Sequence, residues 1–300
     1  MIKKSILIFL VLVVAWAIII RVVPFSASQH QWQENIIKAE QYIYGSETID
    51  NVMVGSSLST RLQTDSLNAY YNLALSGQGI LDGLNVLRRK KELPERVIVE
   101  INFLDRGENE TFSNLVFSPT SFFLKRYFRI LRAGQQPLTA VGNGILIPLF
   151  ELISGKKEID KGEAGTGTEG EAGTAVSDEL FHKMVETNRD LYTEPIDTAT
   201  MDQQFEKLSD HIQYLKSNGV DVVFYEMPVN HQLTKLAKAN YLRNRIMNDF
   251  HDEPFIGLPD YWERIITTDG LHLTDGEATS YTRYLRNELS KLDSADQAFE

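Results

Sequence analysis

Residues 51–59 read NVMVGSSLS, a short apolar run that ends in a glycine and two serines. Such a run, bounded by a turn signal, is typical of a buried strand in a parallel sheet. Gly55 permits a sharp turn, and Ser56 and Ser57 then stand where a helix would begin. A serine at this point either caps the helix or presents its hydroxyl at the carboxyl edge of the sheet, where open α/β sheets bind ligands. This stretch alone leaves both interpretations open.

Strand and helix patterns alternate along the rest of the chain. Strand patterns cover residues 69–75, 97–103, 220–225 and 254–258, and helix patterns cover 80–91, 201–218, 232–250 and 276–292. Strands that alternate with helices pair in parallel through right-handed crossovers. The sequence therefore predicts an α/β domain with a parallel sheet over residues 49–300.

Composition narrows the class of protein. The chain has 300 residues, of which 43% are hydrophobic, and it allows one α/β domain with an insertion or two small domains. A formal net charge of −11 argues against a nucleic-acid partner. With no cysteine, the chain has no disulfide, no Cys-ligated zinc and no thiol nucleophile. No spacing of metal ligands such as His-Glu-x-x-His occurs, so we predict no metal site and no cofactor.

The N-terminus indicates the compartment. Two lysines at positions 3 and 4 precede a nearly continuous apolar run at residues 5–20, which Arg21 interrupts. This length lies between a signal-peptide core and a full membrane span. We expect residues 1–25 to be an uncleaved transmembrane helix, with a cleaved signal peptide as the alternative. By the positive-inside rule, a stalk with a short helix at 26–48 then leads to a domain outside the cytoplasmic membrane.

An insertion at about 107–200 interrupts the alternating pattern. Residues 155–178 are rich in Gly, Glu, Thr and Ala, a composition that predicts a low-complexity surface loop or disorder. Residues 122–132 mix aromatic and cationic side chains at helical spacing. Such a stripe either packs on its own domain or lies on a membrane surface.

Asp269 and His272 stand three residues apart, just before the last helix. Serine chemistry needs a base to take the hydroxyl proton and a carboxylate to hold that base in the right tautomer. Because the last loop of a parallel sheet can lie beside the first, this pair can meet Ser57. The alternative for a bare Asp-x-x-His pair is an ordinary surface loop.

The chain resembles the SGNH/GDSL hydrolases at three places. Residues 55–59, GSSLS, are similar to the Gly-Asp-Ser-Leu-Ser block of that family, and the match implies that Ser57 is the nucleophile. Residues 72–77, NLALSG, are similar to the second block and imply that the N–H of Gly77 joins that of Ser57 in the oxyanion hole. Asp269 and His272 match the last block and imply the orienting carboxylate and the general base. The resemblance covers most of residues 50–105 and 200–292.

The third family block, Gly-x-Asn-Asp, is absent. Residues 100–105 read EINFLD, Leu104 stands where the family has asparagine, and Asn102 is the candidate substitute in the oxyanion hole. The resemblance implies a flavodoxin-like, three-layer α/β/α fold. Membrane-anchored relatives that lack this block look like envelope proteins that work with membrane-bound O-acyltransferases on alginate, peptidoglycan or teichoic acid.

Three functions follow from the resemblance. The first is an extracytoplasmic serine enzyme that transfers an acyl or acetyl group to an envelope polysaccharide, with a membrane-bound O-acyltransferase as partner. The second is a carboxylesterase or deacetylase that hydrolyses acyl esters. The third, which the missing block suggests, is a catalytically weak assembly or binding protein.

Overall fold

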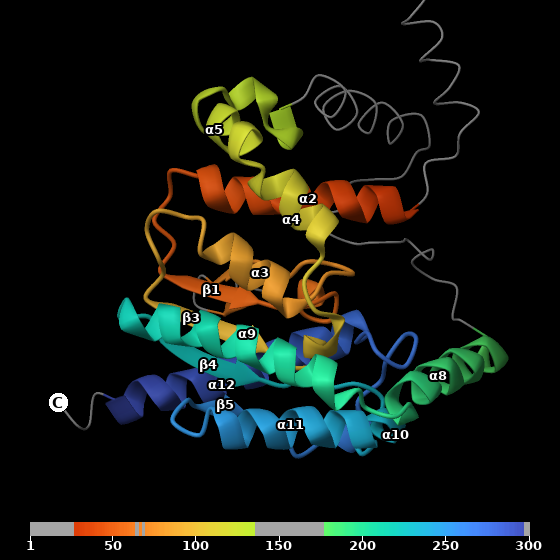
Figure 1. The fold of residues 1–300 in the computed structure, drawn as a ribbon. Coiled ribbons are helices and arrows are strands. Elements are labelled where there is room, and N and C mark those ends of the chain that lie inside the picture. Colours follow the sequence, from red (N-terminus) through yellow and green to blue (C-terminus); the bar gives the residue numbers. More distant parts are fainter. Residues whose placement is uncertain (1–26, 64–65, 68–69, 136–176, 297–300) are drawn as a thin grey trace, which may run out of the picture.

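The computed structural model describes residues 27–63, 66–67, 70–135 and 177–296. Within these ranges five strands form one parallel sheet in the order β2-β1-β3-β4-β5 (Figure 1). The strands are β1 (Asn51–Val54), β2 (Tyr70–Asn72), β3 (Arg96–Glu100), β4 (Asp221–Tyr225) and β5 (Phe255–Ile256). The predicted α/β class with a parallel sheet is confirmed, and the layers are compatible with an α/β/α arrangement.

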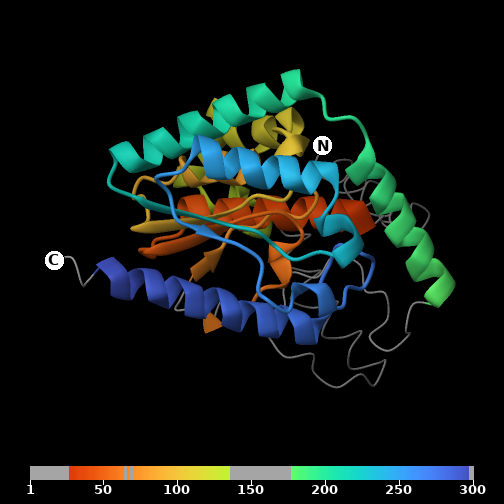
Figure 2. The same ribbon diagram turned by 90° about the horizontal axis from the view of Figure 1, so that it is seen from below.

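Helices cover both faces of the sheet. The helices α3 (Ile80–Leu87), α9 (Thr198–Ser217) and α11 (Ala237–Asp249) pack on one face, and α12 (Asp275–Asp296) packs on the other (Figures 1 and 2). The remaining α-helices of the described ranges are α2 (Ala27–Tyr44), α4 (Glu110–Phe117), α5 (Pro119–Tyr127), α8 (Asp178–Thr193) and α10 (His231–Thr234). Short 3₁₀ turns are η1 (Ser59–Arg61), η3 (Leu104–Arg106), η4 (Arg129–Leu131), η5 (Ala133–Gln135) and η7 (Trp262–Arg264).

The central strands are buried on both faces. Val52 of β1 belongs to the core beneath α3 and α9, whereas its neighbour Met53 belongs to the core beneath α12. Successive side chains of a strand point to opposite faces, so apolar residues at every position fill both cores. This continuous apolar pattern is what the sequence of β1 shows and what a parallel sheet requires.

Residues 27–44, where we expected a stalk with a short helix, form a longer helix, α2, that packs on the domain. Ala39 and Tyr42 are buried, and the ring of Trp32 meets that of Phe112 edge-on at 5.8 Å between centroids. The side chain of Lys90 also donates a hydrogen bond to the carbonyl of Tyr42 over 3.2 Å. The sequence predicts a helix in this segment, and its buried residues Ile36, Ala39 and Ile43, spaced along an otherwise polar segment, are what pack it on the domain.

The expected helix at 232–250 is divided into α10 and α11, and the segment after Ser57 forms the single helical turn η1. The predicted anchor at 1–25 and nearly all of the low-complexity loop at 155–178 lie outside the described residues. Among the described helices, none is both long and apolar enough to span a membrane.

Gly79 gives a test of how the loops after β2 and β3 pack. A Cβ at this position would lie 2.0 Å from the carbonyl oxygen of Gly107, which is backbone and cannot rotate away. We expect Gly79→Ala to lower the free energy of unfolding by roughly 1–3 kcal/mol or more, the usual cost of overpacking. Gly276→Ala is the control, because nothing lies within 4 Å of its Cβ. Urea unfolding of both variants is the measurement, and equal stability would contradict the packing described.

Candidate active site

The predicted site residues gather at the carboxyl edge of the sheet. Ser57 follows β1, Gly77 follows β2, and the loop with His272 precedes α12. The ladder between the first two strands continues beyond them, because the N–H of Leu75 donates to the carbonyl of Gly55 over 3.0 Å. The chain therefore carries Gly77 to the side of Ser57.

Ser57, His272 and Asp269 form a continuous hydrogen-bonded line. Nε2 of His272 lies 3.0 Å from Oγ of Ser57, and Nδ1 of His272 lies 2.6 Å from Oδ2 of Asp269. The side chains of His272 and Asp269 are 24% and 23% exposed. Both are therefore mostly buried, but part of each remains in contact with solvent. This is the geometry in which a carboxylate orients an imidazole toward a serine hydroxyl.

The backbone of the loop holds Asp269 as a carboxylate. Its Oδ1 accepts hydrogen bonds from the backbone N–H groups of His272, over 2.7 Å, and of Leu271, over 2.9 Å. Burial alone would raise the pKa of Asp269, but the interactions with His272 and these two N–H groups outweigh burial and lower the pKa to about 2. An ionised Asp269 requires the Nδ1 proton on His272, so Nε2 is left to accept the proton of Ser57.

Ser56 and Ser57 have different surroundings. Ser56 is fully buried, its Oγ donates to Oε1 of Glu100 over 2.6 Å, and its N–H donates to Oε2 over 2.9 Å. Ser57 is partly exposed, and its Oγ meets His272. Of the two adjacent serines, only Ser57 presents its hydroxyl to an imidazole and to solvent.

Glu100 is a buried carboxyl group that the sequence reasoning did not single out. It lies at the end of β3, and Ser59 donates to its Oε2 over 2.5 Å. Oγ of Ser59 also lies 2.6 Å from the hydroxyl of Tyr225. A Cβ at position 55 would lie 2.7 Å from Oε2 of Glu100, so the close approach of this carboxyl group requires Gly55. Burial raises the pKa of Glu100, although its hydrogen bonds with the serines oppose the shift.

Two backbone N–H groups near Ser57 are free to bind an anion. Within the described part of the chain, neither the N–H of Ser57 nor that of Gly77 meets an acceptor. Gly77 has a φ of +72°, a conformation that favours glycine. The amide of Asn35, on α2, accepts from the N–H of Ser76 over 3.0 Å and donates to its carbonyl over 2.8 Å. Helix α2 thus fixes the backbone next to Gly77.

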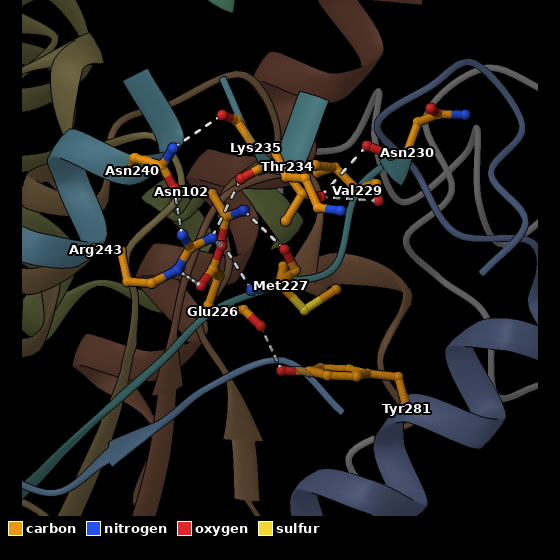
Figure 3. Close-up of polar contacts among 10 residues, drawn as sticks. All are labelled: Asn102, Glu226, Met227, Val229, Asn230, Thr234, Lys235, Asn240, Arg243 and Tyr281. Carbon is orange, nitrogen blue, oxygen red and sulfur yellow. Dashed lines mark hydrogen bonds and ion pairs between the residues drawn. The ribbon is translucent and has the colours of Figure 1, made fainter. Parts of the chain in front are cut away.

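Asn102 is engaged elsewhere. Its amide donates to the carbonyl of Met227 over 2.8 Å and accepts from the N–H of Met227, also over 2.8 Å (Figure 3). These two bonds join the ends of β3 and β4. The adjacent Glu226 forms two hydrogen bonds with Arg243, and its carbonyl accepts from the hydroxyl of Tyr281 over 2.7 Å (Figure 3). The amide of Asn102 is therefore a fixed part of this network.

Two further contacts hold the loop with His272 in place. Arg61, in the turn after Ser57, donates to the carbonyl of Leu273 over 2.7 Å. Asn188, on α8, donates to the carbonyl of Asp269 over 2.9 Å. Helix α8 belongs to the insertion, and no sequence pattern in the insertion marked Asn188 as part of the site.

No protein-family model matches the chain, and a search of curated proteins gives no significant match. Across the described ranges, no group of three or more acidic or histidine side chains is placed to hold a metal ion.

Glu100 gives a pH-dependent test of the site. Because the folded chain holds the Glu100 proton to higher pH than the unfolded chain, the free energy of unfolding falls as the pH rises above about 4.5, its ordinary pKa. In Glu100→Gln the amide oxygen still accepts hydrogen bonds and the amide NH₂ group donates them, but the side chain cannot ionise. We expect its stability to fall less between pH 5 and about 8.

The measurement is urea unfolding across this pH range, with Glu92→Gln as the control. Glu92 is exposed, so the control removes a carboxyl group without touching the turn. A Glu100→Gln variant with the same pH slope as the parent would show that Glu100 is ionised in both states.

Proposed function

We propose that the protein is a serine-dependent acyl-ester enzyme of the SGNH type. The observation that carries the proposal is the line from Ser57 through His272 to Asp269, with contacts of 3.0 and 2.6 Å. Ser57 lies near the start of the chain and the other two near its end. An ordinary surface loop does not require a histidine hydrogen-bonded at once to an aspartate and to a distant serine hydroxyl. The strand order 2-1-3-4-5 is also that of flavodoxin-like sheets, which supports an SGNH-type fold.

The geometry supports a two-step reaction. His272 takes the proton of Ser57 through Nε2 while Oγ attacks the carbonyl carbon of an acyl ester. The negative oxygen of the tetrahedral intermediate faces the N–H groups of Ser57 and Gly77. His272 then gives its proton to the departing alcohol, and the acyl group remains on Ser57. In the second step His272 deprotonates an incoming hydroxyl group, which takes the acyl group, and the proton on His272 returns to Oγ of Ser57 as the ester bond to Ser57 breaks.

The incoming hydroxyl decides between transfer and hydrolysis. We favour transfer to a hydroxyl of an envelope polysaccharide, by a domain that an N-terminal helix anchors outside the cytoplasmic membrane and that works with a membrane-bound O-acyltransferase. The support is the basic flank and apolar run of residues 1–25, together with the resemblance of the three sequence blocks. An esterase or deacetylase would use the same side chains with water as the acceptor.

The engagement of Asn102 with Met227 favours a second candidate. Without the amide of Asn102, the site has two backbone donors for an oxyanion, the N–H groups of Ser57 and Gly77. The second candidate is therefore a binding or assembly protein with little catalytic activity. Removal of one oxyanion donor costs on the order of 10²–10³ in rate, so a two-donor site still supports catalysis. A probe for reactive serines separates the two candidates.

The test is covalent labelling of the full chain by a fluorophosphonate. We expect the parent to react, Ser57→Ala to lose labelling completely and Ser56→Ala to retain part of it. Ser56→Ala is the matched control, because it removes the adjacent hydroxyl and a bond to Glu100 but leaves Ser57 and His272 in place. A parent chain that is folded, as shown by a cooperative melting transition, but does not react with the probe would favour the binding protein. Labelling that survives Ser57→Ala would place the nucleophile elsewhere.

A further inference from the structure

The helices α4 and α5 and the turn η4 carry an unusual concentration of exposed apolar side chains. Of the ten large apolar side chains that are exposed in the described part of the chain, six lie between residues 115 and 131. The most exposed of these six are Tyr127 at 65%, Phe123 at 60% and Phe128 at 55%. We call this group the aromatic platform: Leu115, Phe123, Leu124, Tyr127, Phe128 and Leu131.

The opposite side of α5 is fixed to the domain. Phe122 packs on Tyr44 of α2, with 5.6 Å between ring centroids, and Lys125 forms an ion pair of 2.7 Å with the buried carboxyl group of Glu40. Figure 1 shows α5 on the far side of α2 from the sheet. Phe123 and Tyr127 contact each other at 4.9 Å between centroids. The platform is thus held on a packed helix and presents its rings away from the core.

The charge around the platform is opposite to that of the whole chain. Residues 111–135 contain Lys125, Arg126, Arg129 and Arg132 and no acidic residue, although the chain has a net charge of −11. Arg126 and Arg129 are exposed, and no ion pair engages them among the described residues. Exposed aromatic rings beside unpaired arginines suit the boundary between lipid headgroups and acyl chains.

We propose that the aromatic platform lies on the surface of an anionic phospholipid membrane. The rings of Phe123, Tyr127 and Phe128 enter the interface, and Arg126 and Arg129 contact lipid phosphates. The proposal rests on the membrane anchor of the proposed function, which ends two residues before α2, the helix that supports the platform.

Lipid contact at this surface orients the catalytic domain. Figure 1 places α5 and α8 far apart, on opposite sides of the molecule. Asn188 of α8 contacts the loop that carries Asp269. A membrane at α5 therefore leaves the site accessible from the aqueous side, where a polysaccharide hydroxyl can reach Ser57.

The absence of cysteine allows a direct test with single nitroxide labels in the full chain. We would label Tyr127→Cys on the platform and, as the control, Met247→Cys on α11, where the side chain is 50% exposed. Each labelled chain is reconstituted into vesicles of phosphatidylglycerol and phosphatidylcholine. Accessibility to oxygen, which concentrates in lipid, is compared with accessibility to a water-soluble nickel complex.

We expect the ratio of oxygen to nickel accessibility to be higher at position 127 than at position 247. The combined Arg126→Gln and Arg129→Gln change should lower the ratio at 127 and leave that at 247 unchanged. Equal ratios at the two positions would overturn the proposal. A label at 127 that neither reagent reaches would show that protein covers the platform, and would overturn it too.

The anchor is checked in the same samples. A chain that an alkaline wash removes from the vesicles would contradict the anchor, whereas the accessibility ratios alone decide the platform. Neither result depends on fluorophosphonate labelling of Ser57, so failure of the proposed chemistry remains distinguishable from failure of the membrane contact.

Discussion

Ser56 and Ser59 both donate hydrogen bonds to the carboxyl group of Glu100, one from each side of Ser57. The N–H of Ser56 adds a third bond to the same group. A buried carboxyl group without hydrogen bonds lowers the free energy of unfolding. The turn around Ser57 is therefore stabilised in the conformation that makes these three hydrogen bonds to Glu100. The absence of a side chain at Gly55 lets the carboxyl group approach. The orientation of Ser57, the proposed nucleophile, thus depends on a buried group outside the line of Ser57, His272 and Asp269.

The rest of the site is assembled by contacts between loops that are far apart in sequence. Arg61 joins the turn after Ser57 to the carbonyl of Leu273, 212 residues later. Asn35 fixes Ser76 beside Gly77 from α2, and Asn188 fixes the loop of Asp269 from α8. Each of these contacts is made to the backbone and does not engage the side chains of Ser57, His272 and Asp269. Segments outside the sheet therefore position the candidate site at its edge.

The sequence predicted the elements that repeat a simple pattern. Apolar runs before Gly55 and at residues 220–225 indicated buried parallel strands, and the structure confirms them. Serine at position 57 and the Asp-x-x-His pair indicated a catalytic line that the structure brings within hydrogen-bonding distance, while its activity stays a prediction. Partners that are distant in sequence could not be predicted. In the sequence Glu100 is simply a polar residue at the end of a strand, and it gains its partners only because β1 pairs with β3 in the folded sheet. The pairing of Asn102 with Met227 depends in the same way on the neighbouring strand β4.

The central claim is that Ser57 becomes acylated through His272. The most direct measurement is the mass of the full chain, and of its peptides, after brief reaction with an activated acyl ester and an acid quench. The account predicts one acyl group per chain, located on Ser57, and none in a His272→Ala chain of unchanged melting temperature. An acyl group on any other residue, or equal acylation of Ser57 without His272, would contradict it.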